Sequence, residues 1–269
     1  MSVITISRGT FSGGKLLAEC LAHRLGYRCV DRDVIVERAA AHGVSQDLLR
    51  DALQKPPTFL ERFGHKRYIY LTLIQAALTE EVKDGKAIYH GNAGHLLLRG
   101  GANVLRTRII APIEFRIRTM MERLKYSREE AAAFLQKGDE DRQKWTQFLY
   151  GVNWGDPSLY DVVINLEQMG IDEACGIISG MAKQPCFQFT AESRRSMKDL
   201  ALASRVKADL VLDPKTSELE LDVQASDGEV TISGKIPLLS EVDEIERVVR
   251  STPGVAVLHL DELVSSTRD

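Results

Sequence analysis

A short β-branched strand that runs directly into a glycine-rich turn constrains the fold of this 269-residue chain most strongly. Residues 3–7 read Val-Ile-Thr-Ile-Ser, and Gly9, Gly13 and Gly14 follow before a helical pattern begins. Glycines allow close approach of the backbone to a ligand, and the N-terminus of the following helix points its positive end at the same place. This arrangement is typical of a loop that binds phosphate groups.

The loop matches a known phosphate-binding pattern except at its last position. Gly9, Gly14 and Lys15 fit G-x-x-x-x-G-K-[ST], in which the lysine reaches the β- or γ-phosphate. The final position is Leu16, where the pattern has a hydroxyl that binds Mg²⁺. The structural alternative is an ordinary strand-to-helix turn with a solvent-exposed lysine. We predict that the phosphate cradle is formed by Gly9, Thr10, Phe11, Ser12, Gly13, Gly14, Lys15 and Leu16.

Composition allows this interpretation and excludes several classes of protein. The length and the 44% hydrophobic content are enough for two domains with buried cores. No apolar run reaches the roughly 18 residues of a membrane span, and the first residues lack the pattern of a signal peptide. We therefore predict a cytoplasmic protein without a membrane span. The cysteines form no C-x-x-C pair and are predicted to be reduced thiols, not metal ligands: Cys20, Cys29, Cys175 and Cys186.

The net charge of −3 is distributed unevenly along the chain. From Glu192 onward there are 10 Lys and Arg and 16 Asp and Glu, a net charge of −6, which leaves +3 for residues 1–191. The positive part carries the glycine-rich loop, as an anionic ligand requires. The acidic part is a poor candidate for binding nucleic acid or an anionic lipid surface.

Strand and helix patterns alternate along residues 1–185, which predicts an α/β fold: a parallel sheet with helices on both faces. Ligands of such sheets bind beyond the carboxyl ends of the strands. The expected strands are 3–7, 27–31, 86–90, 104–110 and 161–165. The expected helices are 14–25, 33–42, 46–53, 59–83, 113–124, 128–145 and 171–183.

Polar residues and glycines follow the second and third expected strands. Asp31 could contact a nucleoside acceptor or a Mg²⁺-bound water, and Arg32 a phosphate, whereas Asp33 or Asp31 could simply cap the next helix. Gly91 follows the third strand and would let the backbone approach a ligand. His90 and His95 flank it, but no third ligand is evident, and we predict no metal site.

Arginines in the next two helical segments could belong to a lid. Phosphoryl transfer needs positive groups around the migrating phosphoryl group, because the protein mainly stabilises charge. We predict this role for Arg116 and Arg142. The alternative, an exposed helix face with ion pairs, is preferred for Arg123, Glu129 and Glu130.

The pattern changes after residue 193. Residues 186–193 are predicted to be a linker, followed by a helix in which Met197, Leu200, Ala203 and Val206 form one face. Alternating segments at 219–224, 230–234 and 255–260 predict strands, with Asp227-Gly228 as a hairpin turn and a helix near 240–251. The result is a small α-β-β-α-β unit with no visible catalytic constellation.

Taken together, residues 1–185 resemble the cytidylate kinase-like family. The resemblance is carried by Ile4-Thr-Ile-Ser-Arg8, Ser12-Gly-Gly-Lys15, Leu25-Gly26-Tyr27, Asp31-Arg-Asp33, Glu114-x-Arg116, Lys137-x-Asp139-x-Asp141-Arg142 and Tyr160-Asp161-Val-Val-Ile-Asn165. It implies a P-loop kinase that transfers the γ-phosphoryl group of ATP to CMP or dCMP with Mg²⁺. It places Gly9 to Lys15 on the donor phosphates, Arg116 and Arg142 on the lid side, and Asp31 toward the acceptor.

The chain departs from that family at two places. In cytidylate kinases the loop is similar to G-P-S-G-S-G-K-G-T, whereas this chain has Leu16 after Lys15. After the second strand those kinases have a segment similar to D-T-G-A-M-Y-R, whereas this chain continues from Asp31 with Arg-Asp-Val-Ile. The resemblance therefore supports the fold and phosphate binding better than it supports CMP as the acceptor.

Residues 194–264 resemble a BON domain, most clearly in Asp227-Gly228-x-Val230-x-Ile232-x-Gly234 and Pro253-Gly254-Val255-x-Val257. Such domains are small binding modules, so a small ligand or a protein partner is expected here.

Two functions remain open. The first is a nucleoside monophosphate kinase. The second is a catalytically weak nucleotide sensor whose C-terminal domain regulates or binds a partner. The sequence does not predict the oligomeric state.

Overall fold

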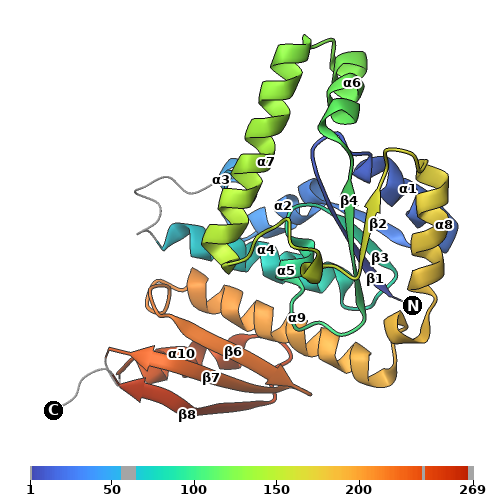
Figure 1. The fold of residues 1–269 in the computed structure, drawn as a ribbon. Coiled ribbons are helices and arrows are strands. Elements are labelled where there is room, and N and C mark those ends of the chain that lie inside the picture. Colours follow the sequence, from blue (N-terminus) through green and yellow to red (C-terminus); the bar gives the residue numbers. More distant parts are fainter. Residues whose placement is uncertain (1, 56–64, 238–239, 266–269) are drawn as a thin grey trace.

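The computed structural model describes residues 2–55, 65–237 and 240–265, and it contains two separate sheets (Figure 1). The larger sheet has the strand order β2-β3-β1-β4-β5, and all its neighbouring strands are parallel. This confirms the predicted parallel α/β sheet. Its strands are β1 (Val3–Arg8), β2 (Arg28–Asp31), β3 (Ala87–His90), β4 (Val104–Ile110) and β5 (Val162–Asn165).

Helices cover both faces of this sheet, as predicted. One core contains residues of α1 and α8, and the opposite core contains residues of α2 to α5 (Figure 1). The helices are α1 (Gly14–Leu25), α2 (Arg32–Ala40), α3 (Gln46–Gln54), α4 (Lys66–Val82), α5 (Gly94–Leu97) and α8 (Ile171–Ala182). Two short 3₁₀ turns are η2 (Pro157–Leu159) and η3 (Pro185–Phe187). The helix predicted at 59–83 is observed from Lys66, and residues 59–64 lie outside the described residues.

Helices α6 (Ile113–Leu124) and α7 (Arg128–Tyr150) form a hairpin that stands beyond the carboxyl ends of the strands (Figure 1). Ser127 and Glu130 make a capping box that starts α7. The hairpin has a small core of its own, made of Ile117, Met120, Ala131 and Leu135, and Phe11 of the glycine-rich loop packs against it. The hairpin and the loop are therefore joined by apolar contact.

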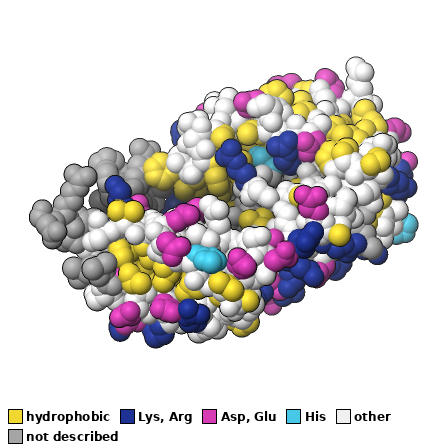
Figure 2. Space-filling model, turned by 90° about the horizontal axis from the view of Figure 1, so that it is seen from below, with side chains coloured by type: hydrophobic (Ala, Val, Ile, Leu, Met, Phe, Trp, Pro, Cys, Tyr) yellow, Lys and Arg dark blue, Asp and Glu magenta, His cyan; other side chains and the backbone are white. Residues whose placement is uncertain are grey.

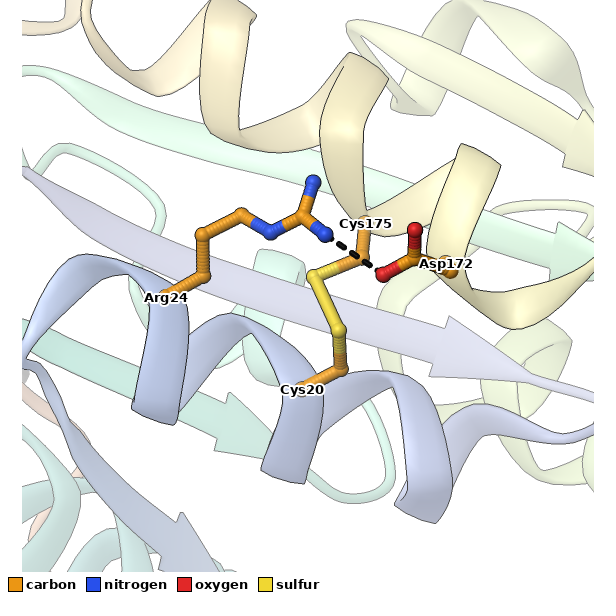
Figure 3. Close-up of a disulfide and its surroundings, with 4 residues drawn as sticks. All are labelled: Cys20, Arg24, Asp172 and Cys175. Atoms are coloured by element: carbon orange, nitrogen blue, oxygen red, sulfur yellow. Dashed lines mark hydrogen bonds and ion pairs between the residues drawn. A yellow bond between two sulfur atoms is a disulfide. The ribbon is translucent and has the colours of Figure 1, made fainter.

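A disulfide between Cys20 and Cys175 links α1 to α8 (Figure 3). The prediction of four reduced thiols is therefore wrong for this pair. The two residues are 155 positions apart, and only the packing of the two helices brings their Cα atoms to 6.3 Å, a separation that a disulfide can span. An ion pair of 2.5 Å between Arg24 and Asp172 spans the same two helices. Cys29 and Cys186 are free and exposed.

The second sheet has the order β6-β7-β8, with β6 antiparallel and β8 parallel to β7. Its strands are β6 (Leu221–Ser226), β7 (Glu229–Ile236) and β8 (Val257–Ser265), and its helices are α9 (Ala191–Leu212) and α10 (Ser240–Ser251). Asp227 and Gly228 both have positive φ, 49° and 86°, as a two-residue hairpin turn requires. Figure 2 shows the molecule from below, and on that side acidic, basic and apolar side chains lie interspersed.

Helix α9 contributes to both cores. Met197 and Ala208 belong to the core of the large sheet, whereas Val206 and Leu210 belong to the core of the small sheet. The prediction that Met197 and Val206 share one face is therefore wrong. Three-residue steps fall short of the 3.6-residue turn, so over nine residues they drift by about half a turn. The helix is apolar on two faces and lies between the two cores.

None of the helices in the described ranges combines the length and the hydropathy that crossing a bilayer requires.

Candidate phosphate-binding site

A cavity of about 520 Å³ lies between the glycine-rich loop, α2 and the α6/α7 hairpin, at the carboxyl ends of the strands. Its described lining contains six basic side chains and one carboxylate. The basic side chains are those of Arg8, Lys15, Arg32, Arg123, Lys137 and Arg142, and the carboxylate is that of Asp141. This excess of positive charge suits a ligand with several negative charges.

The loop backbone leaves hydrogen-bond donors free at the start of α1. Gly13, with φ of 85°, is the N-cap residue, and no side chain caps the helix. The Ser12 hydroxyl donates to the Gly9 carbonyl over 2.8 Å and so stabilises the turn instead of capping the helix. The N–H groups of the first helical turn therefore remain available to an anion, at the positive end of the helix dipole.

Arg116 joins the loop to the lid hairpin from behind the cavity. It is 7% exposed, its Nε donates to the Thr10 carbonyl over 3.0 Å, and its Nη1 lies 2.6 Å from Asp139. A Cβ at Gly9 would lie 3.2 Å from Nη1 of Arg116, so glycine permits this close packing. Arg116 thus holds the loop to α7 and does not line the cavity.

Arg142 reaches the cavity from α7. Its guanidinium lies 3.3 Å from Asp139, 3.4 Å from the Thr10 hydroxyl and 4.8 Å from the centre of the Trp154 ring. Burial, together with the charges of Arg8, Arg116 and Arg108, lowers the pKa of Arg142 to about 10, although Asp139 acts in the opposite direction. The side chain still carries its charge at neutral pH.

The predicted residues are placed as follows. Residues 9–16, Arg32 and Arg142 line the cavity, whereas Arg116 lies behind it. Asp31 accepts a hydrogen bond of 2.9 Å from the Val34 N–H and is the N-cap of α2, the structural alternative considered for it. Gly91 packs against Tyr89 instead of lining the cavity.

Sequence reasoning missed several lining residues. The sequence predicts no role in the site for Arg8 and an exposed helix face for Arg123, yet both residues line the cavity. Asn92 and Gln54 line it as well. Arg8 could have been found, because the last residue of a central strand points to the carboxyl end of the sheet. Arg123 could not, because its position depends on the angle of the hairpin.

His90 and His95 are buried at the ends of β3 and α5. Burial lowers the pKa of each to about 4, and nearby arginines act in the same direction: Arg8 on His90, Arg106 and Arg108 on His95. The His95 ring packs on Tyr160 with 4.7 Å between ring centres. Both histidines are therefore neutral at neutral pH and act as parts of the core.

These histidines are expected to make the fold sensitive to acid. In the unfolded chain a histidine has a pKa of about 6.5. Because the pKa of both histidines is lower in the folded protein, folding favours their neutral form. Their contribution to the free energy of unfolding should be fully present above that pH and should be lost as the pH falls toward about 4. Urea unfolding at a series of pH values measures this. Replacing both residues with glutamine is expected to give a shallower fall over the same range; an unchanged slope would contradict the assignment.

The residues of the cavity do not fit a metal ion held by the protein. Leu16 occupies the position of the metal-binding hydroxyl and is 42% exposed toward the cavity. Asp141 is the one carboxylate in the described lining, and Lys137 lies 2.9 Å from it. Within the described ranges, no group of three or more acidic, histidine or cysteine side chains could hold a metal.

The parallel sheet, the loop at its carboxyl end and the helical hairpin define a P-loop kinase-type fold. Residues 3–168 match the model of the cytidylate kinase-like family, and the chain belongs to that family. Residues 198–259 match the model of the BON domain. Both resemblances expected from the sequence are thereby confirmed.

Individual relatives agree with this assignment. A cytidylate kinase from Ignicoccus hospitalis is 27% identical over 184 residues, which cover 67% of this chain and 99% of the relative. The crystal structure of an uncharacterised protein from Eubacterium ventriosum superposes with a TM-score of 0.53 at 18% identity. That match covers 67% of this chain and 97% of the other and shows a shared fold.

Proposed function

We propose that the protein transfers the γ-phosphoryl group of ATP to a nucleoside monophosphate such as CMP or dCMP. The observation that carries the proposal is the cavity at the loop, where six basic side chains and one carboxylate surround the free N-terminus of α1. Two phosphorylated ligands that approach each other need such an excess of positive charge. Membership of the cytidylate kinase-like family supports the same reaction class.

In this proposal the residues of the site have different roles. The backbone of residues 9–15 and the charge of Lys15 bind the donor phosphates, and Arg142 stabilises the charge on the migrating group. Arg116 positions the loop through the Thr10 carbonyl. Arg32, at the start of α2, faces the acceptor phosphate. Asp31 sets the start of α2.

The bond changes follow from this placement. A phosphate oxygen of the acceptor forms a bond to the γ-phosphorus, while the bond from that phosphorus to the β–γ bridging oxygen breaks. ADP leaves with the electron pair of the broken bond. Because the residues offer no ligand set for a metal, Mg²⁺ would reach the site bound to ATP, held by phosphates and water.

The alternative function is a nucleotide sensor with little or no transfer. Leu16 in place of the hydroxyl favours it, and so does α9, which packs against both cores and could report nucleotide binding to the BON domain. A small ligand or a protein at that domain is the proposed partner. Since ATP and nucleoside monophosphates are cytoplasmic metabolites, the cytoplasm is the proposed location for either function, a compartment in which a disulfide such as Cys20–Cys175 is unusual.

A panel of acceptors separates the two functions. The full chain is incubated with ATP, Mg²⁺ and CMP, dCMP, UMP, AMP or shikimate, and ADP formation is followed. We expect turnover with at least one pyrimidine monophosphate and a much lower rate with shikimate. Turnover with any acceptor removes the pure-sensor proposal, whereas tight ATP binding with no turnover removes the kinase proposal.

A further inference from the structure

Arg8 occupies the space in front of the helix that follows the loop. It is the last residue of β1, the central strand, and pairs in register with Ile109 of β4. A Cβ built on Gly14 would lie 2.0 Å from Cδ of Arg8 and 3.0 Å from its Cγ and Nε. The arginine side chain therefore fills the place that any side chain at position 14 would take, directly at the N-terminus of α1.

The Arg8 guanidinium lies in the cavity without an anionic partner. Within the described part of the chain this guanidinium makes no hydrogen bond or ion pair. Burial lowers its pKa, and the charge of Arg32 acts in the same direction. Arg142 also lies close enough to sense the charge of Arg8. A partly buried guanidinium beside two others costs stability unless an anion compensates it.

Lys15 has a different environment. Its side chain is 72% exposed, and its amino group lies 3.9 Å from Glu19, one turn further along the same helix. A charge with that exposure is screened by water, so we expect Lys15 to add less to the binding of the donor phosphates than a less exposed cation does. Both residues line the cavity, but Arg8 is partly buried whereas the side chain of Lys15 is largely exposed.

We propose that Arg8 is the main phosphate-binding cation of the loop and that its guanidinium, with Arg142, binds the polyphosphate chain of a nucleoside triphosphate. This deepens the proposed function and rests on it for the nucleotide. A planar guanidinium can bind two phosphate oxygens at once, which an ammonium group does less specifically. Gly14 is then required because Arg8 needs its space.

The test compares matched charge removals. Binding of ATP and of inorganic tripolyphosphate is measured by calorimetry for Arg8→Gln and Lys15→Gln. Arg8→Gln is expected to raise Kd by about 100-fold, the effect of losing charge-assisted hydrogen bonds to the phosphates. Lys15→Gln is expected to raise it by less than about fivefold, the effect of an exposed charge. Thermal unfolding of each variant controls for loss of fold.

A relocation experiment makes the test sharper. Gly14→Lys alone should weaken binding, because the new side chain collides with Arg8. Arg8→Gly alone should weaken it by loss of charge. The double variant Arg8→Gly/Gly14→Lys should bind to within about tenfold of the wild type, since a lysine now enters the vacated space.

Three results would overturn the proposal: a larger loss for Lys15→Gln than for Arg8→Gln, a folded double variant no better than Arg8→Gly, or a wild type that binds neither ATP nor tripolyphosphate. Binding that depends on Arg8 without turnover of any acceptor would leave it intact while removing the kinase function.

Discussion

Replacing Arg116 with methionine is expected to lower the free energy of unfolding by about 3 kcal/mol, because it leaves Asp139 without its closest buried partner. The figure is at the low end for a broken buried pair, since Asp139 is itself partly exposed. The Thr10 carbonyl also loses its donor, so the loop is released from the lid hairpin. ATP binding should weaken together with stability. Urea unfolding and calorimetry measure the two effects.

The same helix provides the matched control. Arg118 is exposed on α6, and Arg118→Met should change the free energy of unfolding by no more than about 0.5 kcal/mol. If both variants behaved alike, Arg116 would be a surface residue in solution and the link between loop and lid would be refuted. A loss of ATP binding at full stability would instead assign Arg116 to direct contact with the nucleotide.

Reduction of the disulfide between Cys20 and Cys175 is expected to cost the fold about 4 kcal/mol, the upper end of the usual range. The bond closes a loop of 155 residues, and a cross-link over so long a loop removes much freedom from the unfolded chain. It also ties α1, which begins at the phosphate-binding loop, to α8. Thermal unfolding with and without dithiothreitol, and of the variant Cys20→Ala/Cys175→Ala, measures the contribution.

The exposed cysteines supply the control for this experiment. A Cys29→Ser/Cys186→Ser variant should respond to dithiothreitol as the wild type does, because neither residue is in the disulfide. The Cys20→Ala/Cys175→Ala variant should not respond. If an alkylating reagent modified all four cysteines of the wild type without prior reduction, the disulfide would not form in solution. Dithiothreitol would then leave the free energy of unfolding unchanged.

Much of the larger fold could be predicted because its signals are local. The strand at residues 104–110 is observed with the same bounds, since its β-branched run lies between clear breaks. The helix at 113–124 also agrees, since Pro112 precedes it and a left-handed Lys125 ends it. The glycine-rich loop was recognised because few other structures need glycines between a strand and a helix.

The features that were missed depend on tertiary packing. Cys20 and Cys175 carry no mark in the sequence that pairs them, because their proximity follows from the contact of α1 with α8. The sequence predicts that Arg32 faces the site, but whether Asp31 contacts a ligand or caps the next helix depends on where α2 begins. The burial of Arg116 depends on the angle of the hairpin, which no local pattern encodes.

Because α9 packs into both cores, the boundaries of the family matches do not coincide with the boundaries of the hydrophobic cores in this chain. The cytidylate kinase-like match ends at residue 168, yet the core of the large sheet includes Met197, directly before the BON match, and Ala208 within that match. A fragment cut at the end of the family match would lack these side chains and expose the apolar surface of α4. The core of the larger sheet is thus completed by a helix that lies mostly within the BON match.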